Sequence, residues 1–211
     1  MMQGIKHIIF DLGGVLLNID YQLTEQAFID AGITHFHELY TQLHQTPVFE
    51  QLEMGKITAD EFITALQQTS AVPLSADAVI NAWNAMLLDF PLRRLQLLQQ
   101  LRLHYDLFLL SNTNEIHEQA FNKSLMQNNG IPDLRVMFDR AYYSHRVGLR
   151  KPMPEIFLLV LNENGLEPAH TLFIDDSPQH IAAAKDLGIQ TIYLQKGMTI
   201  EHDIFKPKNP V

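Results

Sequence analysis

The sequence alternates short strand-like runs with helical stretches, and this alternation restricts the possible folds more than any other feature. The strand-like runs span residues 5–10, 106–110, 140–144, 171–175 and 190–194. Helical patterns separate most of them, which is typical of strand-helix-strand units that build a parallel sheet covered by helices on both faces. The sequence therefore predicts an α/β fold with a doubly wound, Rossmann-like core.

The strand pattern is absent between residues 18 and 91, where amphipathic helical patterns follow one another. Thr58 and Glu61 have capping-box spacing, and Ser75 can cap a further helix. We expect residues 18–91 to form a small α-helical cap. This cap would be inserted into a core made of residues 1–17 and 92–211.

Composition favours a globular protein and argues against some classes of partner. The chain has 211 residues, 46% of them hydrophobic, which is enough for a full core. Its 15 Lys+Arg and 24 Asp+Glu give a net charge of −9, which argues against nucleic acid or an anionic membrane as a partner. It has no cysteine, and we read neither a signal peptide nor a membrane span. We expect a cytoplasmic protein, and the sequence does not indicate its oligomeric state.

Polar residues suited to phosphoryl transfer stand where the predicted strands end. Asp11 follows the first strand, Ser111 follows the second, and the pair Asp175-Asp176 ends the fourth. Lys151 stands just before a predicted helix. Because ligands of open α/β sheets bind at the carboxyl ends of the strands, we expect these groups to meet in one site.

The chemistry of these groups is mutually compatible. Asp11 is ionised at neutral pH, so it can act as a nucleophile without a base. A phosphate dianion would be repelled by Asp11 unless positive charge lay nearby. The Lys151 ammonium, and an Mg²⁺ ion held by the oxygens of Asp175 and Asp176, would supply that charge. Ser111 and the amides after it would bind the phosphoryl oxygens.

Each group also has a purely structural interpretation. Asp11 could start a turn, Ser111 could cap a helix, Lys151 could be a solvated loop residue, and Asp175-Asp176 could cap the following helix. The conjunction favours a site, because chemically compatible groups all fall at predicted strand ends in an order that one fold can bring together.

The arrangement resembles the haloacid dehalogenase superfamily, whose members mostly hydrolyse phosphate esters through an aspartyl-phosphate. The resemblance covers nearly the whole chain, with residues 18–91 in the position of the family's helical cap. Four segments are similar to the four motifs of the family in order: Asp11-Leu12-Gly13-Gly14-Val15, Leu110-Ser111-Asn112-Thr113-Asn114, Lys151-Pro152 and Ile174-Asp175-Asp176-Ser177.

This resemblance implies a role for each residue. Asp11 would be the nucleophile, Ser111 and Asn112 would hold the phosphate, and Lys151 would neutralise charge. Mg²⁺ would be bound by three groups, namely Asp11, the Gly13 carbonyl and Asp176, with Asp175 binding it directly or through water.

Gly13 departs from the family pattern, because most of its phosphatases carry a second aspartate there as general acid and base. Glycine can offer a carbonyl to the metal but cannot transfer a proton. We expect acid-base assistance, typically worth about 10²- to 10⁴-fold, to be lost or supplied elsewhere. Sugar-phosphate phosphatases of the family with a similarly altered first motif are the nearest resemblance. A sugar phosphate is therefore the favoured substrate.

Two alternatives remain open. A metal-independent 2-haloacid dehalogenase also needs no proton donor, although the paired acids Asp175-Asp176 argue against it. A catalytically impaired phosphate-binding protein would keep the site without turnover, although it would not need the nucleophile Asp11. Four cap residues are candidates for facing the substrate, while His145 and His180 are given no role. The four are Tyr21, Phe49, Glu53 and Trp83.

Overall fold

A computed structural model describes residues 2–41 and 45–206. Its centre is a parallel sheet with strand order β3-β2-β1-β4-β5. This topology confirms the predicted doubly wound α/β fold. The strands are β1 (His7–Phe10), β2 (Asp106–Ser111), β3 (Arg140–Tyr143), β4 (Thr171–Asp175) and β5 (Gln190–Tyr193).

Strand boundaries differ slightly from the predicted runs. The first strand begins at His7 instead of residue 5, and β3 ends one residue early because Ser144 starts helix α8 (Ser144–Val147). The Ser144 hydroxyl accepts a hydrogen bond from the Thr113 amide and donates one to the Thr113 carbonyl, both at 2.9 Å. Ser144 therefore joins the ends of β2 and β3 instead of extending the sheet.

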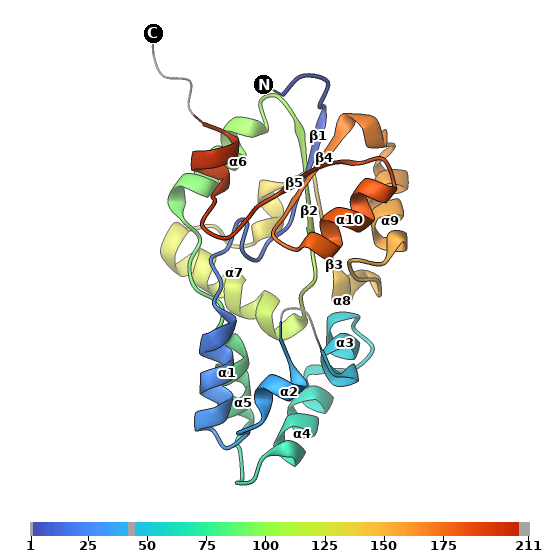
Figure 1. The fold of residues 1–211 in the computed structure, drawn as a ribbon. Helices are drawn as coiled ribbons and strands as arrows, with labels where there is room; N and C mark the ends of the chain where they lie inside the picture. Colours follow the sequence, from blue (N-terminus) through green and yellow to red (C-terminus); the bar gives the residue numbers. More distant parts are fainter. Residues whose placement is uncertain (1, 42–44, 207–211) are drawn as a thin grey trace.

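Helices cover both faces of the sheet (Figure 1). On one face, side chains such as Ile8 and Phe10 pack against α6 (Leu92–Leu101) and α7 (Glu115–Asn129). Side chains on the other face, among them Ile9 and Phe173, pack against α9 (Pro154–Asn164) and α10 (Pro178–Asp186). Alternate residues of β1 thus enter different hydrophobic cores, which explains why its sequence is apolar without interruption.

The inserted helices form a separate layer beyond the carboxyl ends of the strands (Figure 1). They have their own hydrophobic core, in which Phe49, Phe62 and Trp83 are buried. They are α1 (Tyr21–Asp30), α2 (Phe36–Leu39), α3 (Pro47–Glu53), α4 (Ala59–Thr69) and α5 (Ala76–Asn84). We call this layer, made of the described residues 18–41 and 45–91, the cap.

The two chain crossings between core and cap pair with each other. The Asn18 amide donates to the Asp89 carbonyl at 2.9 Å, and the Leu88 amide donates to the Asn18 carbonyl at 3.0 Å. An antiparallel bridge joins Ile19 to Leu87. The predicted caps are also present, because Thr58 and Glu61 form a capping box and Ser75 accepts from the Ala78 amide.

Three short helical turns complete the described chain: η1 (Leu134–Met137), η2 (Pro168–His170) and η3 (Ile200–Ile204). Within the described residues, no helix is both long and apolar enough to cross a membrane.

Candidate active site

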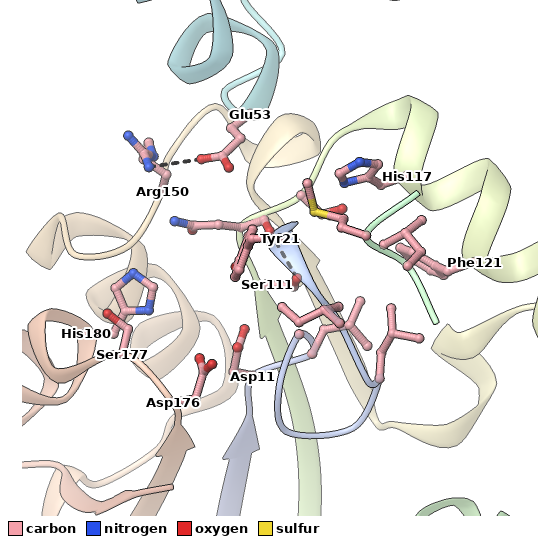
Figure 2. Close-up of a pocket in the computed structure, with 18 of the residues that line it drawn as sticks. Asp11, Tyr21, Glu53, Ser111, His117, Phe121, Arg150, Asp176, Ser177 and His180 are labelled. Carbon is pink, nitrogen blue, oxygen red and sulfur yellow. Dashed lines mark hydrogen bonds and ion pairs between the residues drawn. The ribbon is translucent and has the colours of Figure 1, made fainter. Parts of the chain in front are cut away.

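The structure brings three predicted carboxylates together at the carboxyl ends of neighbouring strands. Asp11 follows β1, Asp175 is the last residue of β4, and Asp176 follows it. One oxygen from each lies within 4.8 Å of the others. Figure 2 shows Asp11 and Asp176 beside each other on the floor of a pocket. The adjacent pairing of β1 with β4 explains this proximity.

Lys151 is the cation that Asp11 and Asp175 share. Its ammonium lies 2.7 Å from Asp11 Oδ1 and 2.7 Å from Asp175 Oδ2. The Lys151 side chain is fully buried, with 0% exposure. A buried charge persists only when it is paired, so this lysine and its two aspartates form one electrostatic unit.

Asn112 places Lys151. Its side-chain amide donates to the Lys151 carbonyl, and its side-chain oxygen accepts from the Lys151 amide, both at 2.8 Å. This reciprocal pair ties the end of β2 to the loop before α9. Because its side chain is engaged in this way, Asn112 would reach a phosphate through its backbone amide.

Both oxygens of Asp175 are engaged by protein groups. Oδ1 accepts from the Ser177 amide at 2.7 Å, and Oδ2 is paired with Lys151. His180 Nδ1 lies 3.0 Å from both oxygens. The predicted ligand Asp175 is therefore saturated by its neighbours, a geometry that suits contact with a metal through water better than direct ligation.

The pKa values follow from burial and from these partners. Burial would raise the pKa of Asp175, but the Lys151 ammonium and the His180 hydrogen bond lower it to about 2. For Asp176, burial and then the charges of Asp11 and Asp175 raise the pKa to about 7. Burial likewise raises the pKa of Asp11, against the opposing effect of Lys151. The three carboxylates thus carry more negative charge than the single Lys151 ammonium balances.

This excess of negative charge fits a divalent cation. The donor atoms are hard carboxylate oxygens, which are the ligands that Mg²⁺ prefers. A second cation would relieve the repulsion that raises the pKa of Asp176. An Mg²⁺ ion would be held by Asp11, Asp176 and the Gly13 carbonyl, with Asp175 contacting it through water.

Gly14 allows the first loop to pass close to Asp176. Its φ is +73°, and a Cβ atom built on it would collide with the Asp176 carboxylate. Leu12 closes the turn, because its carbonyl accepts from the amides of Leu16 at 2.8 Å and Leu17 at 2.9 Å. Glycine is therefore required at position 14 by space and by backbone conformation.

The pocket above the carboxylates is roofed by the cap. Ser111 and Asn112 line it near the floor. Tyr21, Gln45 and Glu53 reach it from the cap, and Figure 2 shows Glu53 and Arg150 together on the side away from Asp11. Of the four cap residues singled out from the sequence, Tyr21 and Glu53 line the pocket, whereas Phe49 and Trp83 lie in the core of the cap.

Some pocket residues had no signal in the sequence. Nothing in the sequence around Arg150 predicts its partners, yet its guanidinium lies 3.0 Å from Glu53 and 2.9 Å from Glu50 across the interface between cap and core. His117 stacks on Trp83 and hydrogen-bonds its carbonyl at 3.1 Å. Only the fold brings these partners together. His180 lines the pocket and contacts Asp175, while His145 pairs with Glu118 at 3.0 Å.

Comparison with known proteins gives consistent matches. A family model for haloacid dehalogenase-like hydrolases matches residues 5–188. A D-ribitol-5-phosphate phosphatase of Bacteroides thetaiotaomicron is 35% identical over 193 residues, which are 92% of this chain and 93% of that protein.

Two solved structures share the whole architecture. A wild-type haloacid dehalogenase family enzyme of Bacteroides thetaiotaomicron, in complex with magnesium and inorganic phosphate, superposes with a TM-score of 0.83 at 33% identity. The match covers 96% of this chain and 100% of that one. A predicted hydrolase of the same kind from Porphyromonas gingivalis gives a TM-score of 0.84 at 32% identity, covering 95% and 94% of the two chains.

Proposed function

Because this chain belongs to the haloacid dehalogenase-like hydrolase family, we propose that it is a Mg²⁺-dependent phosphatase of a small phosphorylated sugar or polyol. The observation that carries the proposal is the shared charge network of Asp11, Lys151 and Asp175, with Asp176 beside it. An anionic nucleophile next to a buried ammonium and a cation-binding carboxylate is what attack on a phosphate dianion needs.

In the proposed reaction, an Asp11 oxygen attacks the phosphorus atom. A bond forms between that oxygen and phosphorus while the bond from phosphorus to the substrate oxygen breaks, and the alcohol leaves with a proton from solvent. Water then attacks the phosphorus atom of the aspartyl-phosphate, which releases inorganic phosphate and restores Asp11. Asp11 is thus the nucleophile of the first step and the leaving group of the second, in which water is the nucleophile.

The surrounding residues hold the phosphate and balance its charge. Ser111 and the backbone amide of Asn112 bind the phosphoryl oxygens, and Lys151 neutralises charge that develops on them. When bound, Mg²⁺ supplies the second positive charge that offsets repulsion between Asp11 and the phosphate. Its ligands would be Asp11, Asp176 and the Gly13 carbonyl, with Asp175 acting through water.

Because residue 13 is glycine, no side chain at that position can protonate the oxygen of the leaving group. Such an enzyme favours substrates whose leaving oxygen needs little protonation, or it obtains the proton from another group or from solvent. The similarity to a D-ribitol-5-phosphate phosphatase supports a sugar or polyol phosphate as the substrate class.

The two alternatives predict different behaviour. A 2-haloacid dehalogenase would release halide in the presence of a chelator, and such a reaction would not need the paired acids Asp175-Asp176 beside Asp11. A phosphate-binding protein would bind without turnover, although it would not need Asp11 to be ion-paired and facing the pocket.

A substrate panel tests the proposal. Purified protein is incubated with phosphorylated sugars, polyols and nucleotides, with Mg²⁺ or with EDTA, and phosphate release is measured beside chloride release from 2-chloropropionate. We expect phosphate release that requires Mg²⁺ and is abolished in Asp11→Asn. Chloride release in EDTA, or phosphate release that Asp11→Asn does not affect, would refute it.

A further inference from the structure

The cap side of the pocket contains buried polar atoms that the described protein leaves without hydrogen bonds. Gln45 Oε1 and Arg150 Nε are both buried, and neither has a hydrogen-bond partner within residues 2–41 and 45–206. Glu53 Oε2 forms an ion pair with Arg150 at 3.0 Å but receives no well-directed hydrogen bond from the described residues. All three residues line the pocket. Buried polar atoms cost free energy unless a partner satisfies them, so this group indicates a ligand.

The chemistry of the three atoms selects the kind of ligand. Gln45 Oε1 and Glu53 Oε2 are acceptors, so each needs a donor, whereas Arg150 Nε is a donor and needs an acceptor. A carboxylate or a second phosphate on the substrate could satisfy only the arginine. An ammonium group could satisfy only the two oxygens. A hydroxyl group both donates and accepts, so neighbouring hydroxyls can satisfy all three atoms.

Charge on the cap side points the same way. Arg150 contacts two carboxylates, Glu50 at 2.9 Å and Glu53 at 3.0 Å, so its single positive charge is already outweighed. The Glu53 side chain is buried, with 8% exposure, and its charge is therefore weakly screened. A second anionic group on the substrate would meet net negative charge. The pocket thus suits a monophosphate whose remaining atoms are uncharged.

We propose that Gln45, Glu53 and Arg150 form a polyhydroxyl-binding subsite, which recognises the hydroxyl chain of the substrate while its phosphate lies at Asp11. We call these three residues the hydroxyl subsite. This inference rests on the proposed function and specifies which part of the molecule selects the substrate. A site that hydrogen-bonds hydroxyls rejects an analogue that lacks them, because its buried polar atoms then stay unpaired.

A matched pair of substrates tests the hydroxyl subsite. Ribitol 5-phosphate and n-pentyl phosphate have the same chain length and leaving oxygen, but only the first carries hydroxyls along its chain. We expect wild-type kcat/KM to favour ribitol 5-phosphate by at least 100-fold. In Glu53→Leu and in Gln45→Leu, we expect the ratio of the two kcat/KM values to fall at least 10-fold, with melting temperatures confirming that both variants fold.

Glu50→Gln is the matched control, because Glu50 contacts the same guanidinium without lining the pocket. We expect its ratio to stay within about 2-fold of wild type. The inference is overturned if the wild type shows no preference, or if neither leucine variant changes the ratio. It is also overturned if both substrates decline in parallel, because that is the signature of a merely structural role for Glu53 and Gln45.

The outcomes separate this inference from the proposed function. Mg²⁺-dependent hydrolysis of n-pentyl phosphate without preference for ribitol 5-phosphate would keep the phosphatase and remove the subsite. Absence of hydrolysis of any phosphate ester would remove both.

Discussion

Replacing Lys151 by methionine tests whether the buried ammonium holds the site together. The Lys151 side chain has 0% exposure, and its Nζ lies 2.7 Å from oxygens of both Asp11 and Asp175. Methionine has a similar length and keeps the packing, but it leaves two buried carboxylates without their cation. Removing one partner from a buried ion pair costs about 3–5 kcal/mol of unfolding free energy. At about 2–4 °C per kcal/mol for a domain of this size, the melting temperature should fall by about 6–20 °C.

The assay is thermal unfolding of wild type and Lys151→Met in EDTA and in Mg²⁺, with phosphatase activity measured in parallel. Mg²⁺ should recover part of the lost stability, because it offers the carboxylates another cation. We also expect activity to be lost. Lys123→Met, which alters an exposed lysine of α7, is the control and should change unfolding free energy by less than about 0.5 kcal/mol. A fall of less than about 2 °C for Lys151→Met would refute the view that this ammonium compensates the buried carboxylates.

Substitutions at Gly13, Gly14 and His117 should change turnover, Mg²⁺ binding and the pH dependence of stability, respectively. Gly13→Asp should fit, because its Cβ would meet only the movable end of the Ile19 side chain, at 3.0 Å. It should raise turnover of phosphate esters with poor leaving groups by up to about 10²-fold. Unchanged turnover with intact Mg²⁺ binding would show that the missing general acid does not limit the rate. Gly14→Ala should weaken Mg²⁺ binding, measured by titration calorimetry, because the φ of residue 14 is +73° and the new methyl group would displace the Asp176 carboxylate. An unaltered Mg²⁺ affinity would contradict this geometry. Burial lowers the pKa of His117 from 6.5 to about 4, so the folded state binds this proton less tightly than the unfolded state does. The free energy of unfolding should therefore decline by up to about 3 kcal/mol as pH falls from 6.5 to 4. Denaturant unfolding across that range should show a smaller decline in His117→Gln, and an equal decline would exclude His117 as the cause.

The core of the fold could be predicted because its signals are local. Each strand is a short apolar run followed by a turn, and the helix after Ser177 begins with Pro178 and ends near Gly188. Alternation of such units restricts the sheet to a parallel arrangement. The strand ends then place Asp11, Ser111 and Asp175 at one edge, as the structure has them.

The cap side of the pocket could not be predicted in this way. Helical periodicity shows that a side chain such as Phe49 or Trp83 faces an apolar surface, but it does not distinguish the core of the cap from the substrate pocket. Arg150 meets Glu53 only because the cap folds over the loop before α9, which is a contact between residues 97 positions apart in sequence. Such contacts depend on tertiary packing that single-sequence patterns do not contain.

Asn112 illustrates a second limit. The family resemblance gave Asn112 a role in holding phosphate, whereas its side chain bonds both backbone groups of Lys151 at 2.8 Å. A sequence motif identifies that a residue matters at a site, but not which of its atoms is used. Its proposed contact with phosphate is therefore assigned to the backbone amide.

We propose that Asp11 is the nucleophile in a pocket made cationic by Lys151 and Mg²⁺. A crystal structure of the protein with Mg²⁺ and beryllium fluoride would identify the nucleophile, because beryllium fluoride bonds a carboxylate oxygen where a phosphoryl group would be transferred. We predict beryllium bonded to Asp11, with Mg²⁺ contacting Asp11 and Asp176. Beryllium fluoride bonded to another residue, or Mg²⁺ bound away from Asp176, would show that Asp11 and Asp176 do not have these roles.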